Sequence, residues 1–379
     1  MTECDGPGVL SVGRLTLSEF RCYPFLRLDT DPRPVVLTGP NGAGKTNILE
    51  ALSFLAPGRG LRRATLSSVT RQSAGPQATW AVAARIVRPD ATVEIGTGRE
   101  ANSERRVLRI DGQPVRTQAA LSEAVSVLWL TPAMDRLFAE GAGGRRRFLD
   151  RLVLGLDSAH AGRAAAYERA LRERTKLLRE GRFDAAWSAV LEETMARHGV
   201  AIAVARKSAV ARLNEACRQG IGPFPAASLA VSGSVEMSLD VLPAEAAEIK
   251  FRDSLAASRR RDAHSGAVAE GPHRSDLMVR HAVTDIPAEQ CSTGEQKAVL
   301  VAIVLGQARI RAAQKGAPPI LLLDEIAAHL DHSRRAALFD ELSALPAQSW
   351  LTGTDDSLFA ELAERGQYFR VCDAAVARA

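Results

Sequence analysis

Hydrophobic and polar residues alternate with a period of two in the first third of the chain, which is typical of β-strands with one buried face. The alternation runs through residues 10–30, where it predicts two short strands, and returns over 78–116. An Asp-Gly turn signal at 111–112 lies inside the second stretch. The pattern predicts an antiparallel meander, followed by a helix near 117–124 and a buried strand at Val125–Leu130.

The middle of the chain has the composition of long helices. Residues 146–219 contain no proline and are rich in Ala, Leu, Arg and Glu, with helices predicted at about 158–180 and 184–219. Gly181 ends the first helix, and Asp184 is suited to cap the second. Two long helices joined by so short a turn predict an antiparallel helical hairpin.

Shorter elements are predicted after the hairpin. Alternating apolar positions predict a strand over 229–239, and a helix is expected over 243–262, where it ends in three arginines. A Gly-Pro-His-Arg turn at 271–274 leads into a strand at Asp276–His281. An apolar helix at Ala298–Gln307 completes the pattern.

A glycine-rich stretch from Gly39 to Thr46 links an apolar run at 35–37 with a helix-forming run at 47–55. The stretch fits G-x-x-x-x-G-K-[ST] in full, in the order strand, loop and helix that a phosphate-binding loop (P-loop) requires. Lys45 supplies a charge to the β- and γ-phosphates, and Thr46 is placed to bind Mg²⁺. The sequence predicts phosphate contacts from Gly39, Pro40, Asn41, Gly42, Ala43, Gly44, Lys45 and Thr46.

A second run points to the same chemistry. The apolar residues Ile320–Leu323 end in Asp324 and Glu325, which is typical of a buried parallel strand whose acidic end lies at the carboxyl edge of a sheet. Asp324 is expected to hold Mg²⁺ through water. Glu325 is expected to polarise the attacking water, with Lys45 as the second catalytic residue.

Two further stretches could face a nucleotide. Ser292, Gly294, Glu295 and Gln296 begin a helix, where backbone amides and the helix dipole favour anions. The alternative is a plain helix cap, with Ser292 as the capping residue and Glu295 at the third position. A later strand from Trp350 ends in small polar residues that could place a hydroxyl near the γ-phosphate, namely Thr352, Thr354 and Asp355.

The chain of 379 residues is long enough for two domains, and its net charge of +5 favours polyanionic partners mildly. DNA contacts are predicted at Arg62 and Arg63, at Arg145, Arg146 and Arg147, and at Arg259 and Arg260; a solvated surface is the alternative. Five scattered cysteines favour a reducing cytoplasm, and the N-terminus, with Glu3 and Asp5, has no apolar segment typical of a signal peptide.

The order of these motifs resembles that of ABC-type ATPases, in which a signature loop lies between the P-loop and the acidic strand. In that family the signature loop of one protomer covers the nucleotide held by another. The resemblance therefore implies a homodimer that binds two ATP molecules, with Ser292 to Gln296 acting in trans and Asp331 as the D-loop aspartate.

Several stretches resemble more closely the RecF family of bacterial DNA replication and repair proteins. They are Phe20–Tyr23, Gly58–Arg62, Arg146–Asp150 and Gly271–Leu277. The resemblance implies an α/β fold, with an ABC-type ATPase head that carries an antiparallel β subdomain and an inserted, mainly helical lobe. The head would comprise 1–152 and 268–379, and the lobe 153–267.

The resemblance also implies a function. ATP and Mg²⁺ would close the dimer on single-stranded, duplex or gapped DNA, slow hydrolysis would release it, and RecR and RecO would be partners in loading the recombinase and supporting the SOS response. Two positions depart from the ABC pattern. Thr352, Thr354 or Asp355 replaces the switch histidine, and Asp135 is the candidate Mg²⁺ contact in a Q-loop region without glutamine.

Three alternatives remain open on the sequence alone. An ABC transporter subunit shares the site chemistry but gives no reason for the inserted helices. An SMC-like chromosome ATPase has an arm of hundreds of residues, whereas helices of about 35 residues reach only ~50 Å. A non-hydrolysing adaptor would use ATP only to hold the dimer together, and Glu325 argues against it.

Overall fold

The computed structural model describes residues 9–75, 78–101, 103–181, 184–218, 220–315 and 318–379. Glu3 and Asp5, which entered the localisation argument, lie outside the described residues. The chain forms two compact units, and each is described by itself. The head unit comprises Met1–Asp135, Gln219–Ala226 and Ser292–Ala379, and the arm unit comprises Arg136–Arg218 and Ala227–Cys291.

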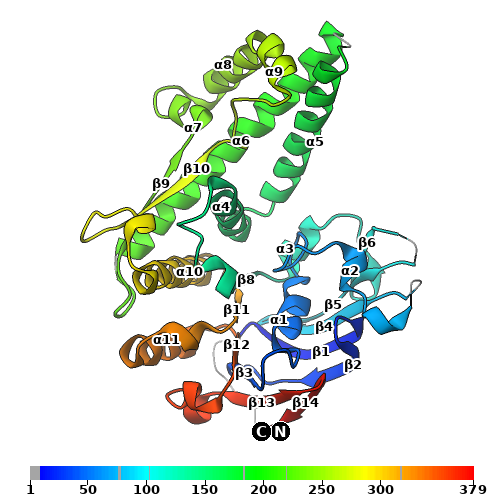
Figure 1. Ribbon diagram of the computed structural model, residues 1–379, viewed down its shortest axis with the longest axis vertical. Helices are drawn as coiled ribbons and strands as arrows, with labels where there is room; N and C mark the ends of the chain where they lie inside the picture. The colour runs from blue at the N-terminus through cyan, green and yellow to red at the C-terminus, as the bar shows by residue number, and fades with distance from the viewer. Residues whose placement is uncertain (1–8, 76–77, 102, 182–183, 219, 316–317) are drawn as a thin grey trace. The chain divides into compact units, whose positions relative to one another are not determined.

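One sheet of the head unit is antiparallel, with the strand order β2-β1-β4-β5-β6-β7 (Figure 1). Its strands are β1 (Ser11–Phe20), β2 (Tyr23–Asp29), β4 (Ala81–Val87), β5 (Thr92–Arg99), β6 (Arg106–Ile110) and β7 (Gln113–Pro114). The predicted strands and meander are confirmed. Asp111 and Gly112 both have positive φ, at 49° and 76°, as a two-residue hairpin turn between β6 and β7 requires.

The second sheet of the head unit is mainly parallel, with the order β14-β13-β3-β12-β11-β8. Its strands are β3 (Val35–Thr38), β8 (Val127–Leu130), β11 (Ile320–Leu323), β12 (Ser349–Gly353), β13 (Gln367–Cys372) and β14 (Ala375–Arg378). Only β14 runs antiparallel to its neighbour. Every residue of β3, β8, β11 and β12 is buried, which explains why these strands are continuous apolar runs in the sequence.

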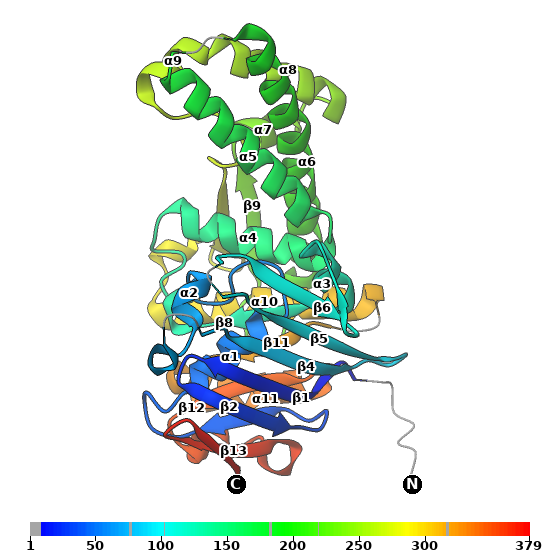
Figure 2. The same ribbon diagram turned by 90° about the vertical axis from the view of Figure 1, so that its right-hand side faces the viewer.

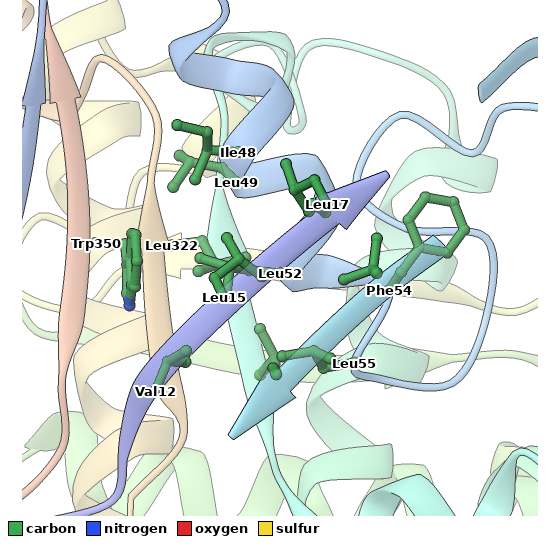
Figure 3. Close-up of a cluster of buried hydrophobic side chains, with 14 of the residues drawn as sticks. Val12, Leu15, Leu17, Ile48, Leu49, Leu52, Phe54, Leu55, Leu322 and Trp350 are labelled. Carbon is green, nitrogen blue, oxygen red and sulfur yellow. The ribbon is translucent and has the colours of Figure 1, made fainter. Parts of the chain in front are cut away.

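The core of the head unit lies between the two sheets, around helix α1 (Lys45–Ser53). Figure 3 shows Leu15 of β1 and Leu52 of α1 close to Leu322 of β11 and Trp350 of β12. Helices α10 (Thr293–Lys315) and α11 (His332–Ala344) lie on the other face of the parallel sheet (Figure 1). The P-loop helix is therefore fixed by apolar packing on both sides, which makes the loop before it rigid.

The arm unit is mainly helical, and its predicted helical hairpin is confirmed (Figure 2). Its helices are α4 (Ala142–Leu156), α5 (His160–Arg179), α6 (Ala185–Arg218), α7 (Ser234–Ser238), α8 (Ala244–Ala257) and α9 (Arg259–Ser265). Strands β9 (Ala227–Ser232) and β10 (Asp276–His281) form a two-stranded antiparallel sheet. The 34 residues of α6 correspond to about 50 Å.

The prediction of one strand over 229–239 was wrong in its second half. Residues Ser234–Ser238 form the short helix α7, where Met237 is 64% exposed and Glu236 is buried. Glu236 accepts hydrogen bonds from Ser275 Oγ at 2.7 and 2.8 Å. In this segment the polar residue Glu236 is therefore buried, because Ser275, which is distant in the sequence, supplies its hydrogen bonds.

The helix predicted over 243–262 consists of two helices, α8 and α9, joined at Ser258. The two compact units also divide the chain at other residues than the predicted 1–152, 153–267 and 268–379. Helix α4 belongs to the arm unit because Arg145 pairs with Asp276 of β10, and β10 belongs there because it pairs with β9.

Candidate nucleotide site

The P-loop has the backbone geometry that its glycines allow. Gly39 and Gly44 have φ values of 145° and 114°, which side chains with a Cβ rarely adopt. A Cβ on Gly39 would lie 2.1 Å from the Val371 carbonyl oxygen, and one on Gly44 would lie 2.6 Å from the Tyr23 hydroxyl. Glycine is therefore required at both positions, sterically as well as conformationally.

Lys45 is buried at the start of α1, and its Nζ donates hydrogen bonds to the carbonyl oxygens of Gly39 at 2.6 Å and Pro40 at 2.9 Å. Burial lowers the pKa of Lys45, and the negative charges of Glu325 and Asp324 oppose this decrease. The ammonium group thus lies inside the loop and near the carboxylates of Asp324 and Glu325, which follow β11. A phosphate group bound by the loop would contact the ammonium group there.

Three strand ends meet beside the P-loop. Strand β12 pairs in parallel with β3 and with β11, so Gly353 lies opposite Thr38, and Leu351 opposite Leu323. This register places Thr352 of β12 beside Asp324, which directly follows β11. Parallel neighbours end at the same edge of a sheet, and this edge is where nucleotides bind in such folds.

Asp324 is the centre of a hydrogen-bonded chain at this edge. Its Oδ1 accepts from Thr46 Oγ1 at 3.0 Å and from Thr352 Oγ1 at 2.7 Å. Thr352 Oγ1 in turn accepts the Glu325 N–H at 2.9 Å. One threonine of β12 therefore holds the side chain of Asp324 and the backbone of Glu325.

Asp324 is 6% exposed, and among the described residues its carboxylate interacts with the charge of Lys45 without forming a close ion pair. Burial of a carboxylate is costly, and a Mg²⁺ ion at this position would offset the cost more directly than the Lys45 ammonium does. No cluster of three His, Cys, Asp or Glu side chains occurs in the described part of the chain. One carboxylate and the Thr46 hydroxyl, completed by phosphate oxygens and water, are the ligand set that Mg²⁺ takes in such sites.

Glu325 has a left-handed backbone conformation, with φ 50° and ψ 29°, directly after β11. A non-glycine residue in this region costs about 1–3 kcal/mol, and such residues occur in tight turns, as at Asp111, and at functional sites. Glu325 is half-buried, and its negative charge raises the pKa of both Lys45 and Lys297, although burial lowers the pKa of each lysine overall. The Glu325 carboxylate is therefore close enough to interact with the positive charges of two buried lysines, Lys45 and Lys297.

The helix start at 292–296 forms the cap that was the alternative interpretation. The Ser292 N–H and Oγ donate to Glu295 Oε2 at 2.9 and 2.7 Å, and the Glu295 N–H donates to Ser292 Oγ at 3.3 Å. Ser292 and Glu295 are exposed, whereas Gln296 is buried. A helix cap and an anion site both use the backbone amides at the start of a helix, so Ser292 and Gly294 can still contact a second chain. The Gln296 side chain, in contrast, is buried.

The other predicted acidic residues have separate local roles. Asp331 caps α11 by accepting from the Arg334 N–H at 2.8 Å, and this interaction lowers the pKa of Asp331. Asp355 accepts from the Ser357 N–H at 2.7 Å, and Thr354 is exposed. Thr352 is thus the switch-strand residue that contacts the acidic pair.

Lys297, which the sequence analysis did not single out, lies 3.5 Å from Asp135 and is 3% exposed. The ion pair links the Q-loop position to the helix that follows the signature. Asp135 therefore has a lysine partner where a Mg²⁺ contact was expected. The Lys297 position follows the signature directly, which is the sequence signal that could have indicated it.

Arg62 of the predicted DNA-contact set is held against the P-loop helix. Its Nη1 donates to Asn47 Oδ1 at 2.8 Å and to Glu50 Oε2 at 3.1 Å. Glu50 is fully buried and also accepts two hydrogen bonds from Arg21, at 2.9 and 2.6 Å. Arg63, beside it, has a positive φ of 55°. Glu50 thus fixes two arginines next to the phosphate site.

The arm arginines divide into structural and exposed residues. Arg145 forms a bidentate pair with Asp276, at 2.8 and 2.7 Å, and Arg146 donates to the Ser275 carbonyl oxygen at 2.7 Å. Arg259 donates to both carboxylate oxygens of the buried Glu192, at 2.9 and 2.5 Å. Arg147 and Arg260 are exposed. Of the predicted arm contacts, these two are the ones that lie open to solvent.

The chain matches the family described as RecF/RecN/SMC N terminal domain over residues 11–369. The DNA replication and repair protein RecF of Allorhizobium ampelinum is 50% identical over 366 residues, which cover 96% of this chain and 97% of that protein. The protein of the same name from Rhizobium etli is 50% identical over 375 residues, 98% of this chain and 99% of that protein.

Solved structures agree on the fold. The chain matches a structure of the recombination mediator protein RecF-ATPrS in the RecFOR pathway with a TM-score of 0.86, 20% identity and 98% coverage of both chains. It matches an Smc head domain with an extended coiled coil from Pyrococcus furiosus with a TM-score of 0.55, 16% identity, and coverage of 98% of this chain and 96% of that one. The predicted α/β ATPase-head fold with helical and antiparallel parts is confirmed. Within the described residues, none of the helices combines the length and the apolar character that a membrane span needs.

Proposed function

The chain belongs to the RecF family of DNA replication and repair proteins, and we propose that ATP switches it between an open form and a homodimer closed on DNA near single-strand gaps. Slow hydrolysis would release the dimer. RecR and RecO would act with it in loading the recombinase onto gapped DNA and in supporting the SOS response. The protein is proposed to act in the cytoplasm; within the described residues Cys22, Cys217, Cys291 and Cys372 form no disulfide bond, which fits a reducing compartment.

The observation that carries this proposal is the position of Asp324 between Thr46 and Thr352, beside Glu325. Hydroxyl, carboxylate and strained glutamate meet where the P-loop would place the γ-phosphate. This arrangement supports phosphoryl chemistry rather than nucleotide storage alone, and it disfavours the non-hydrolysing adaptor.

The residues of the chain have distinct tasks in this mechanism. Lys45 exchanges the carbonyl oxygens of Gly39 and Pro40 for phosphate oxygens. Bound Mg²⁺ would neutralise charge on the phosphates, held by Thr46 and Asp324. Glu325 accepts a proton from the attacking water, and Thr352 keeps the Glu325 backbone in position.

The second half of the site would come from another copy of the chain. Ser292, which is exposed, and Gly294, which is half-buried, lie at the start of α10, where the positive end of the helix favours anions. Each bound ATP would therefore contribute to closure, because each nucleotide contacts both chains. The energy of closure then depends on the bound triphosphate, which makes ATP a switch.

Light scattering with ATP, ADP or no nucleotide tests this proposal, with gapped, duplex or single-stranded DNA added. We expect a dimer with ATP but not with ADP or without nucleotide. The dimer fraction with ATP should rise further when gapped DNA is added. Lys45→Ala is the matched control and is expected to stay monomeric in every condition. Equal dimer fractions with ATP and ADP would contradict the proposal.

A further inference from the structure

The arm unit contains a pocket with a volume of about 740 Å³ that the nucleotide site does not involve. One wall is helix α5, which contributes Arg172, Lys176 and Arg179. The opposite wall consists of residues 266–268 together with His273 and Arg274. All of these residues belong to the arm unit, and the volume is in the range of ligand pockets, roughly 300–1,000 Å³.

The charge of this pocket is strongly one-sided. Among the described lining residues four side chains are cationic, namely Arg172, Lys176, Arg179 and Arg274, and one is a carboxylate, Glu180. Each of the four cations is exposed. Arg172 lies 3.7 Å from Glu168, and Lys176 lies 4.0 Å from Glu180, but such exposed pairs within a helix contribute little and leave the cations available.

The three cations of α5 form a row along one face of the helix. The positions 172, 176 and 179 are spaced by four and three residues, so they point to the same side. From the first to the last the row extends about 10 Å along the helix axis. The buried positions of α5, among them Tyr167, Arg174 and Leu178, lie on another face.

The opposite wall is held rigidly by one histidine. His273 Nε2 faces the Val268 carbonyl oxygen at 3.0 Å, so this nitrogen donates, and Nδ1 accepts from the Tyr167 hydroxyl at 2.7 Å. Arg274 Nε donates to the same Val268 carbonyl at 3.0 Å. Gly271 permits this turn, because a Cβ there would lie 2.3 Å from the Tyr167 hydroxyl. The Arg274 side chain is therefore anchored at its Nε.

We infer that this pocket binds phosphate groups of a nucleic-acid backbone. An extended row of cations matches a ligand with regularly repeating negative charge. Arginine, which supplies three of the four cations, presents a planar donor fork that fits phosphate oxygens. None of the described lining residues is a Phe, Tyr or Trp, so the described part of the pocket binds through charge rather than through stacking on bases. The inference rests on the proposed DNA-binding function.

The pocket also explains the role of the Gly-Pro-His-Arg turn within the arm unit. The turn places Arg274 opposite the row on α5, and His273 ties the turn to Tyr167 of the same helix. Arg274 is thus brought to the exposed cations of α5 by this turn, whereas Arg145 and Arg259 are engaged in internal ion pairs.

Fluorescence anisotropy with labelled gapped DNA tests the inference, using the full chain with ATP over a series of salt concentrations. The test variant is Arg172→Gln/Lys176→Gln, which leaves the buried face of α5 intact. The matched control is Lys250→Gln/Arg252→Gln, which removes one lysine and one arginine from exposed positions of α8. Thermal melting checks that both variants fold.

We expect the test variant to bind DNA more weakly, with a log–log salt slope reduced by about 2, since each backbone contact contributes about 0.9. The control is expected to keep the parent slope. Equal slopes in test variant and control would overturn the inference. Parent protein that binds no DNA with ATP would contradict the proposed function instead.

Two further probes identify the source of the negative charge. Short inorganic polyphosphate should compete with DNA for the parent protein and should bind more weakly to the test variant. This experiment tests the phosphate site even if the protein does not bind DNA. A labelled poly-glutamate peptide should bind both variants equally weakly. Tight peptide binding that the test variant loses, with DNA affinity unchanged, would overturn the inference in favour of an acidic protein partner.

Discussion

Thr352 Oγ1 donates a hydrogen bond to Asp324 Oδ1 at 2.7 Å, across the parallel pair β12–β11. The same oxygen accepts the backbone N–H of Glu325 at 2.9 Å. Where the motif order led us to expect a switch histidine, β12 has the buried hydroxyl of Thr352, which contacts both the proposed metal-binding residue Asp324 and the proposed water-activating residue Glu325. Thr352 therefore couples the two halves of the acidic pair.

Thr352→Val preserves the shape of the side chain but removes the hydroxyl. Asp324 loses a donor and the Glu325 N–H loses its acceptor, so we expect the free energy of unfolding to fall by about 1–2 kcal/mol. ATPase activity should fall by more than the loss of folded protein accounts for. Half-maximal activity should also require a higher Mg²⁺ concentration than in the parent. Thr354→Val is the control, because Thr354 is exposed two residues away. Equal Mg²⁺ titrations of the two variants would contradict the role of Thr352.

Glu325→Gln removes the proton acceptor and keeps the size of the side chain. We expect ATP binding to remain and turnover to fall by about 100-fold or more, because general bases contribute about 10²–10⁴. The ATP-bound dimer should accumulate on DNA. Single-turnover hydrolysis measures this, with the exposed Glu364→Gln as control. Turnover equal to that of the parent would remove Glu325 as the base.

The stability of the arm unit should depend on pH through Asp150. Burial raises the pKa of this carboxyl, but hydrogen bonds from His160 and Arg206 outweigh the effect, and the pKa lies below its usual value. A carboxyl whose pKa is lower in the folded state stabilises the fold above its unfolded pKa, about 3.9, and loses this contribution as the pH falls through its folded pKa.

We therefore expect acid unfolding of the parent arm at low pH, and a flatter pH dependence in Asp150→Asn. At pH 7 the variant should lose about 1.5–3 kcal/mol, because the buried Arg206 loses its charged hydrogen-bond partner Asp150 and keeps Glu236, which lies 3.8 Å away. Urea unfolding followed by circular dichroism measures both. Asp240→Asn is the control, since Asp240 pairs with Lys207 at an exposed position. A pH dependence in Asp150→Asn as steep as in the parent would exclude Asp150 as its source.

Much of the fold could be predicted because its elements are periodic and local. The P-loop carries its chemistry in eight consecutive residues, Gly39 to Thr46, and the buried strands are unbroken apolar runs. The predicted segment 229–239 failed where a distant partner reversed the pattern, since Ser275 satisfies the buried Glu236. Periodicity contains no information about such a partner.

The ion-pair partners of charged side chains likewise could not be predicted from the sequence. Arg145 pairs with a residue 131 positions away, and Arg259 with one 67 positions away, so a run of arginines looked like a free basic patch. The same holds for Thr352, whose contact with Asp324 depends on the register of three parallel strands. Tertiary pairing decides these roles, and residue type alone does not.

The central claim is that each nucleotide site is shared between two copies of the chain, and mixing two inactive variants tests it most directly. Lys45→Ala removes the P-loop half. Gly294→Asp places a negative charge in the signature half, at a position where a Cβ meets no atom within 4 Å, so the chain itself should fold normally.

Each variant alone should lack ATPase activity. A mixed dimer has one intact site, formed by the P-loop of the Gly294→Asp copy and the signature of the Lys45→Ala copy, so we expect mixing to restore part of the parent activity. No recovery on mixing, or full activity of Gly294→Asp alone, would contradict a site shared between two chains.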